Sequence, residues 1–152
     1  GTTFTARNAR DQEGHGFELE MDWKASEAVR LRGNYAWHHA EDRKTDHRIA
    51  DAPAQQVYLR ADWKFLPDWT LSPQGTWVGD RVRAANDLRP EIDDYTLVDL
   101  TLRRGHLFKN LEIAASLRNL FDEAAREPSS GIIPDDYPLA GRSVWLELTW
   151  RM

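Results

Sequence analysis

The chain has 152 residues, which fits a single domain, and carries a net charge of −5 at neutral pH. It contains no cysteine, which excludes disulfides, a thiolate nucleophile and cysteine metal ligands, and its net negative charge argues against a nucleic-acid partner. No run approaches the roughly 18 apolar residues of a transmembrane helix, although strands with one polar face can cross a bilayer without such a run.

Apolar and polar residues alternate along most of the chain. Segment 17–24, for example, has an apolar residue at every odd position and a charged residue at every even one. This period of two is typical of a strand between an apolar and a polar medium. Most such segments have about 9–12 residues, the length that a tilted strand needs to cross a bilayer. The sequence predicts eight strands: 2–8, 17–24, 29–38, 57–65, 69–77, 98–103, 111–121 and 144–152.

Aromatic residues gather near the ends of these strands, as in the interfacial girdles of membrane barrels. One group lies beside short connections and the other near long ones: Trp23, Trp63, Phe65, Trp69 and Trp150, and then Tyr35, Trp37, Trp77, Tyr95 and Phe121. The short connections are 24–28, 66–68 and 104–110, and the long ones are 39–52, 80–94 and 122–139. This asymmetry is typical of bacterial outer-membrane barrels, whose short turns are periplasmic.

Segment 110–127 is ambiguous. Ile113, Leu117 and Leu120 fit a helical stripe at least as well as alternate residues fit a strand, and periodicity alone favours a helix.

The chain ends on an alternating segment without a polar tail. Its apolar positions form the expected barrel-assembly signal: Val144, Leu146, Leu148, Trp150 and Met152. A strand that closes the chain in this way is expected to be a paired, integral element.

Four segments resemble the C-terminal part of a TonB-dependent outer-membrane receptor. Segments 16–20 and 51–59 resemble strand entries of that family. More specific are its Asn-Leu-Phe-Asp motif and the Gly-Arg pair before its final strand, here Asn119, Leu120, Phe121, Asp122, Gly141 and Arg142. Terminal Met152 departs from the family, where phenylalanine is usual. The resemblance favours a strand, not a helix, over 111–121.

The resemblance implies an all-β fold, an antiparallel up-and-down transmembrane β-barrel segment of about eight strands. Because such receptors have about 22 strands and a plugged lumen, residues 1–152 are expected to form the C-terminal portion of a larger barrel, without the plug. The start at Gly1, without a leader, is also expected of a processed or truncated chain. The implied function is active uptake of a scarce nutrient such as a ferric siderophore, cobalamin or glycan.

The resemblance also implies partners and a location in the bacterial outer membrane. The partners are membrane lipid, a plug domain and TonB through the missing N-terminal part, the barrel-assembly machinery through the last strand, and a small-molecule or metal-chelate ligand. The charges expected on the lumen side could form cross-strand pairs or hold the plug: Glu18, Glu20, Asp22, Arg30, Arg32, Arg60, Asp62, Lys64, Asp99, Arg103, Glu112, Arg118, Glu147 and Arg151.

Ligand-binding residues are expected on the long loops. Arg81, Arg83 and Arg89 are candidates for an anionic ligand, because arginine forms charge-assisted bonds with anions. Two groups of residues contain potential metal ligands, and neither predicts a metal site: His38, His39, Asp46 and His47, and then Asp135 and Asp136. We find no catalytic motif, and we predict neither an enzyme nor a cofactor.

Two other functions are compatible with the alternation of apolar and polar residues. One is a small, self-contained eight-stranded outer-membrane barrel with an anchoring or interaction role. The other is a soluble barrel with a ligand inside, but it would bury about a dozen charges in a small core, which is prohibitive without pairing.

Overall fold

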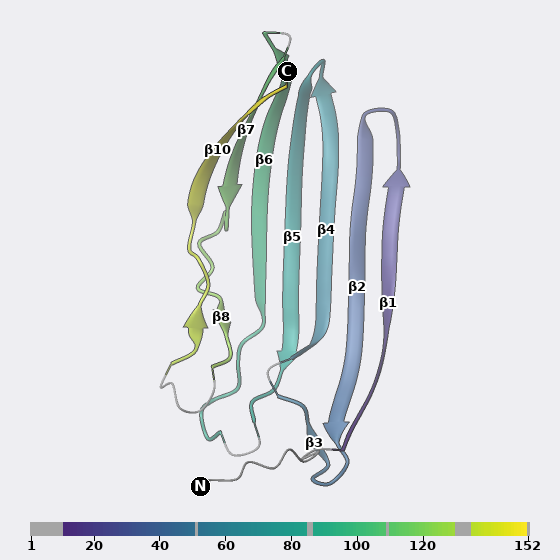
Figure 1. Ribbon diagram of the computed structural model, residues 1–152, viewed down its shortest axis with the longest axis vertical. Coiled ribbons are helices and arrows are strands. Elements are labelled where there is room, and N and C mark those ends of the chain that lie inside the picture. The colour runs from purple at the N-terminus through teal and green to yellow at the C-terminus, as the bar shows by residue number, and fades with distance from the viewer. Residues whose placement is uncertain (1–10, 51, 85–86, 109, 130–134, 152) are drawn as a thin grey trace, which may run out of the picture.

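The computed structural model describes residues 11–50, 52–84, 87–108, 110–129 and 135–151, and these contain strands and no helix (Figure 1). None of the described residues therefore forms a helix long and apolar enough to span a membrane. Seven strands are long: β1 (Gln12–Lys24), β2 (Val29–Asp42), β4 (Pro53–Leu66), β5 (Trp69–Arg81), β6 (Tyr95–Leu107), β7 (Leu111–Arg118) and β10 (Ser143–Trp150). Three have two residues each: β3 (His47–Arg48), β8 (Arg126–Glu127) and β9 (Tyr137–Pro138).

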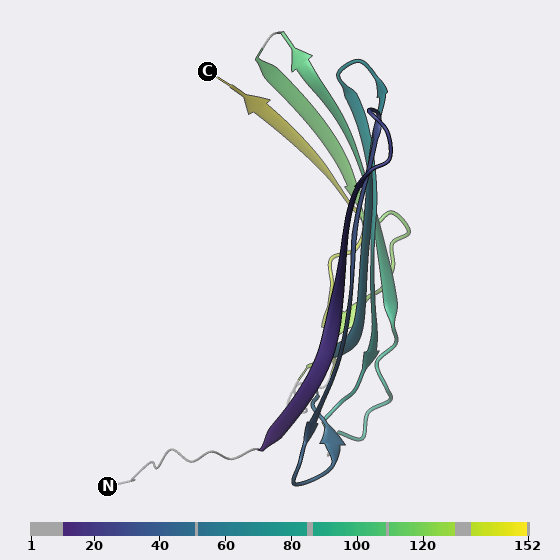
Figure 2. The same ribbon diagram turned by 90° about the vertical axis from the view of Figure 1, so that its right-hand side faces the viewer.

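The long strands form one antiparallel sheet in the order β1-β2-β4-β5-β6-β7-β10, and β3 pairs with the end of β2. The sheet is curved and open, with β1 and β10 at its two edges (Figures 1 and 2). The short turns lie at one end and the long loops at the other (Figure 1), and Arg151 donates its N–H to Asn110 in the turn between β6 and β7. This arrangement confirms the predicted up-and-down order and the predicted division into short and long connections.

The register of the strands places the apolar and the polar residues on opposite faces of the sheet. Phe17 pairs with Trp37, and Met21 pairs with Gly33, so apolar residues of neighbouring strands share the face called here the outward face. Asp22 pairs with Arg32 on the other, inner face. Large apolar side chains are widely exposed on the outward face, such as that of Leu59 at 56%. An apolar surface of this extent requires a covering partner, which for a sheet of membrane-spanning length is the bilayer.

Two irregularities interrupt the pairing near the short turns. Between β4 and β5 the register shifts between Lys64 and Leu66, and between β6 and β7 it shifts between Arg104 and Leu107. Each shift lets a strand carry extra backbone without disturbing the alternation along the rest of the sheet.

Few described side chains are buried, and a small core lies at the long-loop end of the inner face. There Val78 of β5 and Tyr95 of β6 pack with Ala125, which the loop between β7 and β10 supplies. Leu97 and Leu139 cover this cluster. The loop carries the β8–β9 hairpin, so the long connection folds onto the inner side of the sheet instead of extending freely.

Seven of the eight predicted strands are present, and the eighth, 2–8, lies outside the described residues. The helix favoured by periodicity over 110–127 is wrong, because Leu111–Arg118 forms β7. That strand ends before Asn119, whose φ of 49° starts a turn. Tyr95 does not join an outward aromatic row, because its hydroxyl donates to Glu127 on the inner side at 2.7 Å.

Candidate functional site: the inner face and the outer loop cluster

The charges of the inner face are paired across strands, with Asp62 of β4 at the centre. The Asp62 carboxylate accepts hydrogen bonds from Arg60 at 2.8 and 2.9 Å and also from Arg32 of β2. Arg32 and Arg60 are direct cross-strand partners, an arrangement of like charges that is unfavourable by itself. Asp62 therefore neutralises two cations that the register forces together.

A third residue donates to Asp62 because the sheet is interrupted beside it. The pairing of β4 with β5 passes directly from Arg60–Gln74 to Trp63–Leu71, because Pro73 has no N–H for the ladder. At this gap the buried hydroxyl of Ser72 donates to Asp62 at 2.6 Å. Asp62, the hub of this network, thus connects the three neighbouring strands β2, β4 and β5.

The pairing continues to both sides of the hub. Gln74 donates to Asp99 at 2.9 Å, and Arg103 pairs with Glu112, which also lies 3.8 Å from Arg151. Towards the other edge, Arg30 pairs with Asp22, and both side chains are more than half exposed. The inner face is consequently a polar wall with a network of ion pairs, to which Glu18, Glu20, Lys64 and Glu147 contribute no ion pair among the described residues.

The polar wall also carries aromatic rings, and that of Trp145 forms a contact with an arginine. Trp145 of β10 lies on the inner face, and the guanidinium of Arg118 lies over its ring at 4.5 Å from the centroid. This cation–π contact explains why the final strand has an aromatic residue among its otherwise polar inward positions.

The first family motif forms a turn that connects β7 to the entry of β10. Asn119 is 4% exposed, and its amide donates to the carbonyl oxygens of Glu123 and Ala140 at 2.9 and 3.2 Å. Its side-chain oxygen accepts the Glu123 N–H at 2.8 Å. Asparagine suits this position because it tolerates the left-handed backbone better than most residues.

Asp122, the last residue of this motif, connects it to the Gly141–Arg142 pair. Asp122 accepts the backbone N–H of Arg142 at 2.8 Å, and the two side chains approach to 3.7 Å. A Cβ at Gly141 would lie 3.2 Å from the Asp122 carboxylate, so a small residue fits best there. Leu120 donates its N–H to Val98, whereas the side chain of Phe121 is exposed. These contacts suggest a structural role for the motif residues.

The outward residues of β10 lie where the alternation predicts them. Val144, Leu146, Leu148 and Trp150 are all at least 60% exposed on the outward face of this edge strand, and Met152 lies outside the described residues. Their proposed use as an assembly signal stays a prediction.

The candidate ligand arginines belong to a cluster of loop residues, here called the outer loop cluster: Arg81, Arg83, Asp87, Arg89, Ser129 and Asp136. Arg83 forms a bidentate pair with Asp136 at 2.5 and 2.7 Å, and Arg89 lies 3.4 Å from the same carboxylate. Arg89 also pairs with Asp87 and donates to Ser129 Oγ at 2.9 Å. The cluster therefore joins the loop after β5 to the loop before β10.

Arg81 differs from the two loop arginines because it is 4% exposed and lies at the end of β5. Asp80 has a φ of 55°, which breaks the alternation and turns Arg81 towards the small core. There it donates to the carbonyl of Arg126 at 2.6 Å and lies 4.8 Å from the Tyr95 ring centroid. These contacts make Arg81 less accessible to a ligand than Arg83 or Arg89.

The arginines lower the pKa values of the carboxyl groups in this cluster. The hydrogen bonds from Arg83 hold the pKa of Asp136 well below its usual range, and those from Arg89 lower the pKa of Asp87 to about 2. A lowered pKa stabilises the folded loops above the ordinary value of 3.8, and this contribution is lost as pH falls through the lowered values.

We therefore expect the outer loop cluster to be insensitive to pH between 7 and 5 and to open between about pH 4 and pH 2. Hydrogen–deuterium exchange, corrected for intrinsic rates, should show unchanged protection of residues 87–94 and 135–139 at pH 7 and 5 and reduced protection at pH 3. Amides in the middle of β5 serve as the internal control. Loss of loop protection already between pH 7 and 5 would contradict this assignment.

The structure does not bring the potential metal ligands of the histidine group together. His38 and His39 are adjacent in β2 and face opposite sides of the sheet, while His47 of β3 pairs with Asp42 of β2. His39 instead lies opposite His15, with ring centroids 5.5 Å apart, a contact that the sequence analysis missed. Among the described residues, no group of three histidine or carboxylate side chains is placed to hold a metal ion.

Comparison with known proteins identifies the family. A family model described as "TonB dependent receptor-like, beta-barrel" matches residues 1–120. The Metal-pseudopaline receptor CntO of Pseudomonas aeruginosa is 31% identical over 134 residues, which cover 82% of this chain and 18% of the relative. The chain thus spans about a fifth of the length of the curated relatives that it matches.

Solved structures show the same fold. FpvA of P. aeruginosa bound to a heterologous pyoverdine matches 91% of this chain and 19% of its own, with a TM-score of 0.78 and 19% identity. The copper transporter OprC matches 93% of this chain and 24% of its own, with a TM-score of 0.79 and 16% identity. The chain therefore belongs to the TonB-dependent receptor β-barrel family, a family of outer-membrane transport receptors rather than enzymes.

Proposed function

We propose that residues 1–152 form the C-terminal part of the barrel wall of a receptor that takes up a metal chelate. The observation that carries this proposal is the division of the sheet into an apolar outward face and an inner face with paired charges, in a chain of this family. The relatives named as a metal-pseudopaline receptor and a ferripyoverdine receptor support a metal chelate as the ligand class.

In this proposal each part of the chain has a separate task. The inner face lines the lumen and contacts the plug, which the N-terminal part of the whole receptor supplies. TonB acts on that N-terminal part. The free edge of β10 pairs with another strand of the whole barrel, and its outward residues serve the assembly machinery. The long loops meet the ligand.

Within the loops, we propose that Arg83 and Arg89 bind an anionic group of the chelate and that Arg81 supports them from the core. Both loop arginines pair with Asp136, so a carboxylate of the ligand could take the place of that side chain. Binding would then release the contact between the two loops.

Substitutions in the full-length receptor test this role. Arg83→Ala should weaken chelate binding about 10- to 100-fold, because a hydrogen bond to a charged group contributes roughly 1.5–3 kcal/mol. Arg43→Ala is the matched control, since Arg43 is another loop arginine, paired with Glu13. Binding is measured by calorimetry with a ferric siderophore, a nickel metallophore complex and a zinc metallophore complex.

Asp136→Ala separates ligand binding from loop packing. If the arginines bind the ligand, this variant binds at least as tightly as the unmodified receptor, because it removes the competing carboxylate. If the cluster only holds the loops together, Arg83→Ala and Asp136→Ala weaken binding alike. Failure of the full-length receptor to bind any of the three probes, together with unchanged metal uptake by cells that lack it, would refute the proposed function.

A further inference from the structure

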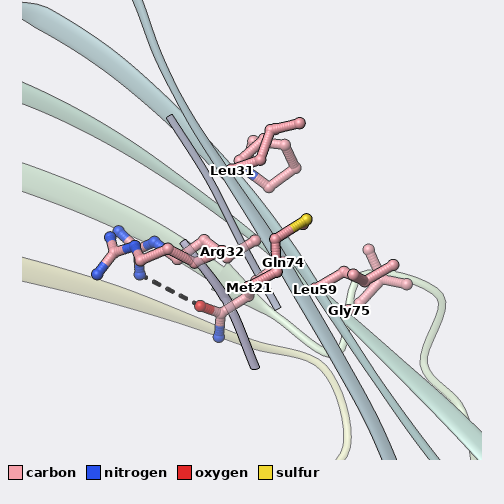
Figure 3. Close-up of a pocket in the computed structure, with 10 residues that line it drawn as sticks. Met21, Leu31, Arg32, Leu59, Gln74 and Gly75 are labelled. Carbon is pink, nitrogen blue, oxygen red and sulfur yellow. Dashed lines mark hydrogen bonds between the residues drawn. The ribbon is translucent and has the colours of Figure 1, made fainter. Parts of the chain in front are cut away.

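The outward face has a hollow at mid-strand. Its volume is about 400 Å³, and Figure 3 shows Met21, Leu31 and Leu59 on its side of the sheet, with Arg32 and Gln74 directed to the other side. The apolar residues around its floor and walls are Leu31, Leu59, Ala61, Pro73, Gly75 and Val98. The hollow is therefore a recess in an apolar surface and separate from the polar inner wall.

Gly75 opens the recess, in a cross-strand row that also contains Gly33. The row runs from Gly33 through Leu59 and Gly75 to Val98. A Cβ at Gly33 would lie 2.7 Å from Leu59 Cδ2, so the leucine side chain occupies the space over Gly33. A Cβ at Gly75 would meet no described heavy atom nearer than the Leu97 carbonyl oxygen at 4.0 Å, so the space over Gly75 stays open.

The recess lies at the middle of the membrane-spanning band. Leu59 is four residues from Trp63 on β4, and Gly33 is four residues from Trp37 on β2, each about 13 Å along its strand. Trp63 packs with Phe65 in the row beside the short turns, and Trp37 packs with Phe17 in the row towards the long loops. Because aromatic rows mark the two interfaces, the recess opens to hydrocarbon.

We propose that this recess is a binding site for one acyl chain of an outer-membrane lipid. The outward face adjoins the bilayer between the two aromatic rows, so lipid tails are the molecules that reach the recess. An empty recess would leave its lining without dispersion partners, which makes an occupying chain favourable. Since lipid tails are as apolar as the lining, retention depends on shape and contact and not on the hydrophobic effect.

This mode of binding makes two features of the site testable. Binding should be insensitive to the lipid headgroup, because the two arginines of the lining, Arg32 and Arg60, direct their guanidinium groups to Asp62 on the inner face. It should also be abolished by a side chain that fills the space over Gly75. Gly75→Leu does this without the clash that Gly33→Leu would cause. Ala115→Leu is the matched control, since it adds an outward leucine on β7, where Ala115 pairs with Leu102 and Leu146, away from the recess.

Native mass spectrometry of the full-length receptor tests the proposal. The probes are phosphatidylethanolamine and phosphatidylglycerol with identical acyl chains, added to receptor stripped by detergent exchange. A heat-modified gel shift confirms that each variant is folded. The unmodified receptor and Ala115→Leu should retain one lipid of either kind through a second exchange, and Gly75→Leu should retain none.

Three results would overturn the proposal. The unmodified receptor could retain no lipid, or Gly75→Leu could retain as much as Ala115→Leu. A doubled protein mass that Gly75→Leu abolishes would instead assign the recess to contact between two receptor copies.

Discussion

Replacement of Asn119 by alanine should destabilise the barrel by roughly 2–4 kcal/mol, because the substitution leaves an N–H and two carbonyl groups without their partner in a buried turn. Alanine also tolerates the positive φ of this residue less well than asparagine does. The expected consequence is a loosened connection between β7 and β10, so the final strand detaches first. Urea unfolding in lipid vesicles, followed by the heat-modified gel shift, measures the loss.

Glu123→Ala provides the control for this prediction. Glu123 lies in the same turn, but its side chain is exposed and forms no hydrogen bond or ion pair with the described residues, so the substitution should change stability by less than about 0.5 kcal/mol. Asn119→Asp adds a second comparison, since it keeps the acceptor for the Glu123 N–H and loses both donated bonds. Equal unfolding midpoints for Asn119→Ala and Glu123→Ala would disprove the proposed role of the turn.

Replacement of Asp62 by alanine should destabilise the sheet by about 1–3 kcal/mol, since it leaves Arg32 and Arg60 opposite each other without their shared carboxylate. Asp22→Ala removes the same kind of side chain from the same face. Asp22 is about half exposed, so its pair with Arg30 should contribute only about 0–1 kcal/mol. Comparison of the two variants separates the hub from an ordinary surface pair.

A second substitution tests the physical reason for the Asp62 effect. If repulsion between Arg32 and Arg60 causes the loss, Arg32→Met should recover part of it in the Asp62→Ala background. If instead Asp62 acts mainly through its bond to Ser72, Ser72→Ala should reproduce the loss and Arg32→Met should recover nothing. Unfolding midpoints of the single and double variants, treated as a double-mutant cycle, give the answer.

The sequence predicts the sheet well because its faces lie between two different media. Alternation of residues such as Phe17 and Glu18 is a strong signal when one face contacts hydrocarbon and the other a polar lumen. The same signal fails in segment 110–127, where small alanines weaken the alternation and leave a helix equally compatible. There the Asn-Leu-Phe-Asp motif was the better guide, and β7 ends directly before it.

Contacts between distant residues could not be predicted in the same way. The positive φ of Asp80, which turns Arg81 into the small core, has no signature in the alternation. The pairing of Arg83 with Asp136 joins residues that are far apart in sequence and lie in two loops without periodicity. The contact of His15 with His39 depends on the exact register of β1 with β2, which begins earlier than the alternating segment suggested.

The two register shifts beside the short turns have a consequence for how such a barrel can change in length during evolution. Loss of one codon within β2 or β5 would invert the faces of the residues beyond it in the same strand, with charges placed in hydrocarbon and apolar side chains in the lumen. At the shifts next to Leu66 and Leu107, one residue can be gained or lost while the faces keep their composition. Homologous chains should therefore differ by single residues at these two places and by pairs of residues elsewhere in the strands.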